Sequence, residues 1–259
     1  MSIIYEPTGR AREYAPLAAN LYSGCAHGCT YCFGPSTLRK TRDDFHNNVQ
    51  PKKNALERLR KDAAKLEGND HEILISFVTD PYQPAEDIHQ ITRRAIEILI
   101  FHGLRFTILT KGGIRAMKDF DLLKGYDKCS FGTTLVFGGD KAKEWEPSAP
   151  SPADRIATII EAKDQGIKTW VSLEPVIDPD EALQLISVLE HIVDHWKVGK
   201  INHWPAIEKA VDWVQFRESA KALLEEIGAD YYFKKSLSEL DEREEAAKKL
   251  DAVVKELNR

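Results

Sequence analysis

Cys25-Ala-His-Gly-Cys29-Thr-Tyr-Cys32-Phe33 contains three of the four cysteines in this chain of 259 residues. At the spacing C-x3-C-x2-C, one tight loop can direct the three thiolates toward a common metal centre. Iron–sulfur clusters are held by cysteine thiolates of this kind. Three ligands without a fourth nearby suit a [4Fe–4S] cluster in which one iron atom stays open to a ligand that is not protein.

Other uses of these cysteines fit the spacing less well. A zinc site that adds His27 departs from the usual paired spacing of structural zinc ligands, because His27 lies between two of the cysteines. A disulfide framework needs an oxidising compartment and usually a small chain. A closed electron-transfer cluster needs a fourth cysteine, and Cys129 is the only one left. The zinc site remains the alternative to the cluster.

Composition predicts a globular protein of the cytoplasm. Hydrophobic residues make up 42% of the chain and charged residues 30%, which is ordinary for globular domains. No apolar run approaches the length of about 18 residues that spans a bilayer, and the first residues lack the pattern of a signal peptide. We therefore expect no membrane partner, and clustered reduced cysteines point to the cytoplasm.

The net charge of −5 gives no global sign of nucleic-acid binding. A local exception is the basic segment, residues 39–61, in which eight lysines and arginines face only three carboxylates. The segment is either a solvated surface or a surface that contacts phosphate groups. Nucleic acid is therefore one candidate partner.

Short apolar strands alternate with helices from residue 17 onward. The predicted strands are 17–23, 73–78, 106–109, 130–136, 169–173 and 196–201. The predicted helices are 54–67, 91–102, 114–123, 153–164, 179–193 and 206–227. This alternation predicts an α/β fold of parallel β-α units with right-handed crossovers. Six units are too few for a closed eight-stranded barrel, and a further short strand is expected from Tyr231 on.

Polar residues follow nearly every predicted strand. Enzymes built from β-α units place their chemistry on the loops after the strands, although helix caps and solvent contact also favour polar residues there. These residues are Thr79, Asp80, Thr110, Lys111, Thr133, Thr134, Glu174, Lys200 and Asn202.

The cysteine stretch resembles the signature of the radical S-adenosylmethionine (SAM) enzymes, C-x3-C-x-aromatic-C, with Tyr31 at the aromatic position. Further sequence segments are similar to those of the spore photoproduct lyase-like branch, many members of which are described as DNA repair photolyases. They are Ser76–Glu86, Leu109–Gly112, Val171–Pro179 and Val198–Trp204. The resemblance, which covers about residues 17–204, implies an open, TIM-like partial (β/α)6 barrel with a C-terminal helical extension. We expect one domain over residues 1–259, with its core at about 17–227 and a charged helix at 239–257.

The resemblance also implies cofactors and chemistry. Cys25, Cys29 and Cys32 would hold the [4Fe–4S] cluster, and its open iron would bind SAM. One electron from the cluster would cleave SAM to a 5′-deoxyadenosyl radical, which abstracts hydrogen from a substrate that the sequence does not identify. The electron would come from an external donor similar to flavodoxin or ferredoxin.

Five residues are predicted to contact SAM. In many radical SAM enzymes a Gly-Gly-Glu motif after the second strand receives the SAM amino group, whereas here that strand ends in Thr79 and Asp80. These two residues, with Glu86 as a further candidate, would accept from the ammonium. Lys111 would pair with the SAM carboxylate. The remaining two candidates are Tyr31 and Glu174, the latter for the ribose hydroxyls.

The sequence leaves two classes of function. Spore photoproduct lyase uses a cysteine outside the cluster as a hydrogen donor, but no cysteine lies between Cys32 and Cys129 here, so the lyase reaction itself is not expected. The favoured hypothesis is a radical SAM enzyme with an unidentified substrate. The rival is a non-catalytic iron–sulfur or metal-binding module, which would not need polar residues at the strand ends.

Overall fold

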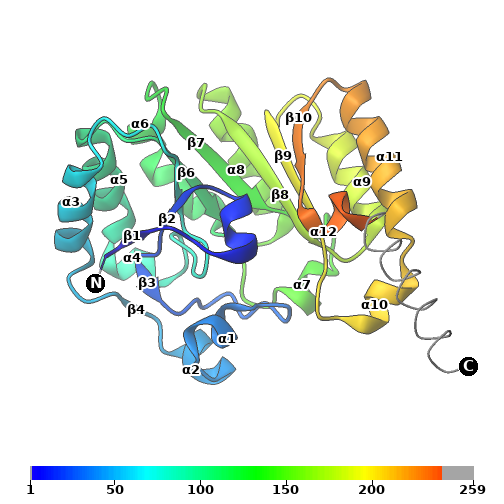
Figure 1. Ribbon diagram of the computed structural model, residues 1–259, viewed down its shortest axis with the longest axis horizontal. Coiled ribbons are helices and arrows are strands. Elements are labelled where there is room, and N and C mark those ends of the chain that lie inside the picture. The colour runs from blue at the N-terminus through cyan, green and yellow to red at the C-terminus, as the bar shows by residue number, and fades with distance from the viewer. Residues whose placement is uncertain (1, 241–259) are drawn as a thin grey trace, which may run out of the picture.

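A computed structural model describes residues 2–240 and shows helices packed against an eight-stranded sheet (Figure 1). The strands, in their order across the sheet, are β1 (Ile4–Tyr5), β2 (Leu17–Ala19), β5 (Ile73–Ile75), β6 (Phe106–Thr110), β7 (Cys129–Thr134), β8 (Thr169–Val176), β9 (His195–Lys200) and β10 (Asp230–Phe233). Strand β1 pairs antiparallel with β2, and every later pairing in this sheet is parallel.

The α/β prediction is confirmed, and the sheet stays open because β1 and β10 form its two edges. Strand β10 is the short strand that the sequence predicts from Tyr231 on. The longer helices are α3 (Ala55–Lys65), α5 (Ile91–Phe101), α8 (Pro152–Asp164), α9 (Pro179–Val188) and α11 (Trp213–Glu226). The shorter ones are α1 (Gly34–Leu38), α2 (Arg42–Asn47), α4 (Ala85–His89), α6 (Phe120–Leu123), α7 (Ala142–Trp145), α10 (Pro205–Ala210) and α12 (Lys235–Ser238), with 3-10 helices η1 (Gly9–Glu13) and η2 (Gly113–Asp119).

The predicted strand 17–23 is wrong as a single strand. It breaks at Asn20, whose side-chain Oδ1 accepts hydrogen bonds from the backbone N–H groups of Phe77 and Val78 at 3.0 and 2.9 Å. After this break the chain leaves the main sheet as β3 (Tyr22–Ser23), which pairs with β4 (Gln50–Pro51) in a separate two-stranded sheet. The cysteine loop therefore begins on a stem outside the main sheet.

The predicted helix 179–193 ends earlier, at Val188, and two other predicted helices are divided. Residues 114–123 form η2 followed by α6 rather than one α-helix. Residues 206–227 are divided into α10 and α11, because the Asp212 side chain accepts from the backbone N–H of Gln215 at 2.9 Å and starts a new helix. Most of the predicted helix 239–257 lies outside the described residues.

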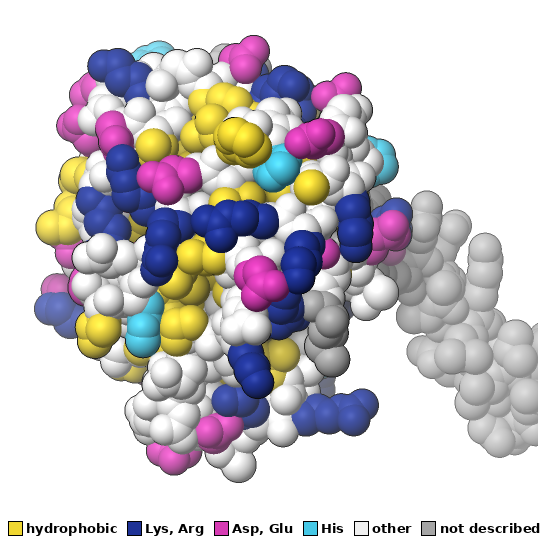
Figure 2. Space-filling view, turned by 90° about the vertical axis from the view of Figure 1, so that its left-hand side faces the viewer, with side chains coloured by type: hydrophobic (Ala, Val, Ile, Leu, Met, Phe, Trp, Pro, Cys, Tyr) yellow, Lys and Arg dark blue, Asp and Glu magenta, His cyan; other side chains and the backbone are white. Residues whose placement is uncertain are grey.

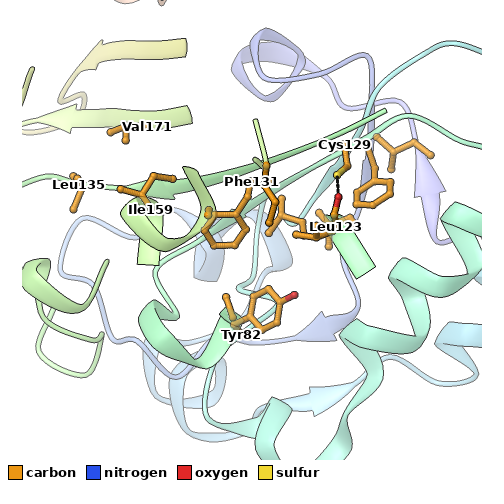
Figure 3. Close-up of a cluster of buried hydrophobic side chains, with 14 of the residues drawn as sticks. Tyr82, Leu123, Cys129, Phe131, Leu135, Ile159 and Val171 are labelled. Carbon is orange, nitrogen blue, oxygen red and sulfur yellow. Dashed lines mark hydrogen bonds between the residues drawn. The ribbon is translucent and has the colours of Figure 1, made fainter. Parts of the chain in front are cut away.

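The apolar core has two layers. The larger lies between the sheet and its helices, and Figure 3 shows part of it, with Cys129 beside Phe131 and the Cys129 thiol donating to the carbonyl of Leu123. Burial raises the pKa of the Cys129 thiol to about 12, so this cysteine is an inert core residue. A smaller core includes Tyr14 and Trp170, so the N-terminal segment packs on the other face of the sheet. None of the helices in residues 2–240 combines the length and apolar character needed to cross a bilayer.

A substitution at Gly132 tests how tightly the smaller core is packed. A Cβ atom at Gly132 would lie 2.2 Å from the indole ring of Trp170, so Gly132→Ala should lower the free energy of unfolding by about 1–3 kcal/mol, the usual cost of overpacking. The matched control is Gly139→Ala, because a Cβ atom there meets nothing within 4 Å. Urea denaturation of both variants provides the measurement. Equal stability of the Gly132 and Gly139 variants would contradict this packing.

Candidate active site

The eight residues selected from the sequence line one pocket of about 530 Å³. The pocket lies where the parallel strands end, as the position of these residues after the strands requires. The eight are Cys25, Cys29, Tyr31, Cys32, Thr79, Asp80, Lys111 and Glu174.

Helix α2 holds one side of the cysteine loop. The Arg42 guanidinium donates to the carbonyl of Cys29 at 2.7 Å, and Nδ1 of His46 donates to the carbonyl of Cys25 at 2.8 Å. The backbone N–H of Cys25 in turn donates to the carbonyl of Phe45 at 3.0 Å. These contacts fix the backbone at two of the three cysteines.

The segment that follows α7 holds the other side of the loop. The backbone N–H of Thr30 donates to the carbonyl of Trp145 at 2.8 Å, and the N–H of Ser148 donates to the carbonyl of His27 at 3.1 Å. The loop is therefore fixed from two directions before any metal binds.

The three thiols have the chemistry that a [4Fe–4S] cluster needs. They are free thiols that face the same pocket, and Cys25 and Cys29 are buried. Burial raises the pKa of the Cys29 thiol to about 11 although the Lys111 charge opposes the shift, so iron must displace a proton there. Across residues 2–240, no three His, Cys, Asp or Glu side chains are grouped to hold one metal ion. A four-iron cluster does not require such a group, because each thiolate binds a different iron atom.

Asp80 connects the second strand end to the third and to the cysteine loop. One carboxylate oxygen accepts from the Thr110 hydroxyl at 2.6 Å and from the backbone N–H of Tyr82 at 2.8 Å. The other accepts from the backbone N–H of Lys111 at 2.7 Å and lies 3.1 Å from Nε2 of His27. Burial by itself would raise the pKa of Asp80, but His27 and the hydrogen bonds lower it to about 2. Direct contact of Asp80 with the SAM ammonium stays a prediction.

Lys111 and Tyr31 meet at a buried carboxylate that the sequence analysis did not select. The Tyr31 hydroxyl donates to Glu146, whose Oε1 lies 3.8 Å from Nζ of Lys111. The Arg155 guanidinium lies 2.6 Å from the other Glu146 oxygen, and both of these side chains are fully buried. The Lys111 side chain keeps 16% exposure, so its ammonium can still reach a ligand in the pocket.

Glu174 belongs to a second group of polar side chains at the far end of the pocket. Its carboxylate accepts from the Tyr14 hydroxyl and lies 3.3 Å from Nζ of Lys234. The Lys234 ammonium also lies 3.5 Å from the centre of the Tyr14 ring. A Cβ atom at Gly199 would approach Glu174 and Lys234 to 2.9 Å, so glycine leaves room for this pair.

One further sequence candidate, Glu86, lies outside the pocket. Glu86 is fully buried, and its carboxylate accepts from Tyr22 and from the free N–H groups of Ile91 and Thr92 at the start of α5. It is therefore a helix-capping residue, and its proposed role toward SAM is wrong. Thr79 lines the pocket and is 7% exposed.

A model of the radical SAM superfamily matches residues 19–191. The chain belongs to the radical SAM superfamily. Enzymes of this superfamily use a [4Fe–4S] cluster and SAM, so the predicted family and cofactors are confirmed. The fold of this radical SAM protein therefore brings the cysteine loop together with the polar residues at the strand ends in one pocket.

Relatives are known by sequence and by structure. An uncharacterised protein of Methanocaldococcus jannaschii is 29% identical over 185 residues, which cover 71% of this chain and 66% of that protein. The radical SAM Nalpha-GlyT isomerase of Pseudomonas phage M6 is 29% identical over 165 residues, which cover 60% of this chain and 32% of the phage protein.

A spore photoproduct lyase mutant with bound AdoMet and dinucleoside spore photoproduct has a TM-score of 0.68 at 15% identity. The similarity covers 88% of this chain and 78% of that chain. At this identity the likeness establishes a shared fold, which agrees with the branch that the sequence motifs indicate.

Four residues of the site were not predicted from the sequence: Glu146, Arg155, Tyr14 and Lys234. Glu146 lies in a loop, and Arg155 lies in a helix where an arginine is ordinarily exposed. Tyr14 and Lys234 come from opposite ends of the described chain. No local pattern reveals these residues, because Glu146, Tyr14 and Lys234 join the site through contacts distant in sequence, and Arg155 joins it by its burial beside Glu146.

Asp80→Asn should destabilise the protein. The substitution removes the buried charge and directs an amide N–H₂ group toward one of the donors that Asp80 now binds, so we expect a loss of about 3 kcal/mol in the free energy of unfolding. Asp87→Asn is the matched control, because Asp87 is 53% exposed and pairs with Arg115 at the surface, where a pair contributes about 0–1 kcal/mol. Urea titrations should separate the two variants. Similar losses in both would show that Asp80 does not join these segments.

Proposed function

We propose that this protein reductively cleaves SAM and uses the resulting radical to abstract a hydrogen atom from a substrate in the same pocket. The observation that supports this most is the pocket itself, which gathers three cluster-type thiols with three lysines, two carboxylates and three tyrosines. When bound, the cluster supplies the single electron that breaks the SAM sulfonium bond. The protein supplies binding, orientation and exclusion of water.

Each residue has a proposed task. Cys25, Cys29 and Cys32 hold the cluster. Lys111 binds the SAM carboxylate through its ammonium, which Glu146 and Tyr31 hold at the edge of the pocket. These assignments follow from charge and position.

The other two contacts complete the SAM site. Thr79 and Asp80 bind the SAM ammonium, with Asp80 also keeping the backbone of Lys111 in place. Glu174 accepts from the ribose hydroxyls, because its carboxylate is held by Tyr14 and Lys234 but is not fully buried.

A nucleic-acid substrate is the second candidate. Aromatic rings line the outer part of the pocket, where Phe33 lies 5.1 Å from Phe77 and Phe77 lies 5.5 Å from Tyr14, measured between ring centres. Such rings can stack on a base, and Arg10 in the same pocket can contact a phosphate. The spore photoproduct lyase structure with a bound dinucleoside supports this candidate by analogy. Among the other rings that could stack on a base, His203 lines the pocket, whereas Trp145, Trp196 and Trp204 do not.

A non-catalytic iron–sulfur module is less well supported. Such a module needs the three thiols of the cysteine loop, but it does not need a pocket lined by Lys111, Thr79 and Glu174. Anaerobic reconstitution with iron and sulfide, reduction by dithionite and addition of SAM distinguish the two functions. The proposed enzyme forms 5′-deoxyadenosine, and a sensor module does not.

The cysteine assignment predicts opposite results for two alanine variants. Cys29→Ala should lose the cluster and with it 5′-deoxyadenosine formation, since two thiolates cannot retain a four-iron cluster. Cys129→Ala should keep its iron content, because Cys129 lies in the core and not in the pocket. Iron and sulfide analysis with the visible absorption spectrum provides the measurement. Loss of the cluster in the Cys129 variant would contradict the assignment of three ligands.

Lys111→Ala should weaken SAM binding while the cluster spectrum stays unchanged. The lost charge-assisted hydrogen bond corresponds to about 1.5–3 kcal/mol of binding free energy. Lys118→Ala is the control, because Lys118 is exposed on η2. Isothermal titration of the reconstituted proteins with SAM measures both affinities. Unaltered affinity in the Lys111 variant would remove this lysine from the SAM site.

A further inference from the structure

The cluster cover, residues 34–53, is an excursion that leaves the cysteine loop after Cys32 and returns beside its stem. It contains α1, α2 and β4. Its last part pairs with β3, and the backbone N–H of Lys52 donates to the carbonyl of Leu21 at 2.8 Å. Figure 1 shows α1 and α2 projecting from the body of the fold. Both ends of the cover are therefore fixed to the cysteine loop and its stem.

The inner side of the cover touches the cluster loop directly. Arg42 and His46 are one helical turn apart on α2, and each donates to the carbonyl of a cysteine, Cys29 and Cys25 respectively. Arg42 is nevertheless an exposed residue. A single layer of side chains thus separates the loop that holds the cluster from the solvent on this side.

The cover is basic in a chain that is acidic. It carries five lysines and arginines against two aspartates, whereas the whole chain has a net charge of −5. Arg39 and Lys53 are exposed. In Figure 2, which faces the left-hand side of Figure 1, lysine and arginine side chains gather across the middle and lower part of the surface.

The opposite wall of the cysteine loop has a different charge. Residues 140–148, which contact the loop through Trp145 and Ser148, contain two lysines and three carboxylates. Lys141 there is already paired with Asp178 and Glu181. Lys40 of the cover is likewise paired with Asp44, so the two walls differ in net charge, with three excess cations on the cover and one excess anion on the opposite wall.

We propose that the outer surface of the cluster cover docks a small acidic one-electron carrier protein, which reduces the cluster through α2. This inference rests on the proposed function. During turnover SAM and substrate fill the pocket side of the cysteine loop, so a protein donor must approach through a wall of the loop. The carrier loses one electron and the cluster gains it, and no proton or leaving group moves. Complementary charge steers such transient encounters and makes them sensitive to salt.

The test compares two double charge reversals in the reconstituted protein. Arg39→Glu with Lys53→Glu alters the cover, and Lys124→Glu with Lys168→Glu alters exposed lysines just before β7 and β8, at the other end of the strands. The affinity for an acidic flavodoxin, measured by titration at low salt, should fall at least about tenfold in the cover variant. The control variant should stay within about twofold of wild type. Wild-type affinity should also fall at moderate salt.

Two assays of 5′-deoxyadenosine complete the test. With reduced flavodoxin the cover variant should be about tenfold slower at low flavodoxin concentration, and with dithionite it should equal wild type. Wild-type flavodoxin affinity and rate in the cover variant would overturn the proposal. It would also be overturned if this variant kept flavodoxin binding but lost binding to a labelled oligonucleotide, since the cover would then be a nucleic-acid surface. If the wild-type protein forms no 5′-deoxyadenosine with dithionite, the proposed function is wrong. The docking proposal is still tested in that case, because flavodoxin affinity is measured separately.

Discussion

The Asp80 carboxylate is the interaction on which the geometry of the site depends. It binds the end of β6 through Thr110 and the backbone of Lys111, and it lies 3.1 Å from His27 in the cysteine loop. Three segments that are distant in sequence therefore meet at one buried charge. Such a charge is tolerated because every oxygen has donors around it, and its depressed pKa of about 2 keeps it ionised. The positions of the cluster loop and of Lys111 are coupled as a result.

Charges around the pocket are divided between two ends. Near the cysteines, Glu146 is held between Lys111 and Arg155. At the far end, Glu174 is held between Tyr14 and Lys234. Each carboxylate is fixed in place before a ligand arrives, so a zwitterionic ligand such as SAM meets oriented groups rather than mobile ones. Preorganisation of this kind lowers the cost of binding.

In the proposed enzyme, ligands and the electron reach the cysteine loop from different elements of the fold. The pocket opens between the strand ends and the N-terminal segment, whose Arg10 and Tyr14 form part of its wall. In the cluster cover, α2 contacts the carbonyls of Cys25 and Cys29, while Thr37 of α1 borders the pocket. In the proposed enzyme SAM and substrate use the pocket and the electron uses the cover.

The sequence by itself determined the parallel α/β order, the three thiols and the polar strand ends, because apolar periodicity and ligand spacing are local properties. Asp80 and Lys111 could be placed together because parallel strands end at one edge of a sheet. Only the tertiary structure decided that the strand 17–23 breaks at Asn20 and that Glu86 caps α5. It likewise decided that Glu146, Arg155, Tyr14 and Lys234 belong to the site. The role of Arg155 arises from its burial beside Glu146. The roles of Glu146 and Tyr14 arise from contacts with Tyr31 and Glu174, which are 115 and 160 positions away in the sequence, and no local pattern encodes contacts at those separations.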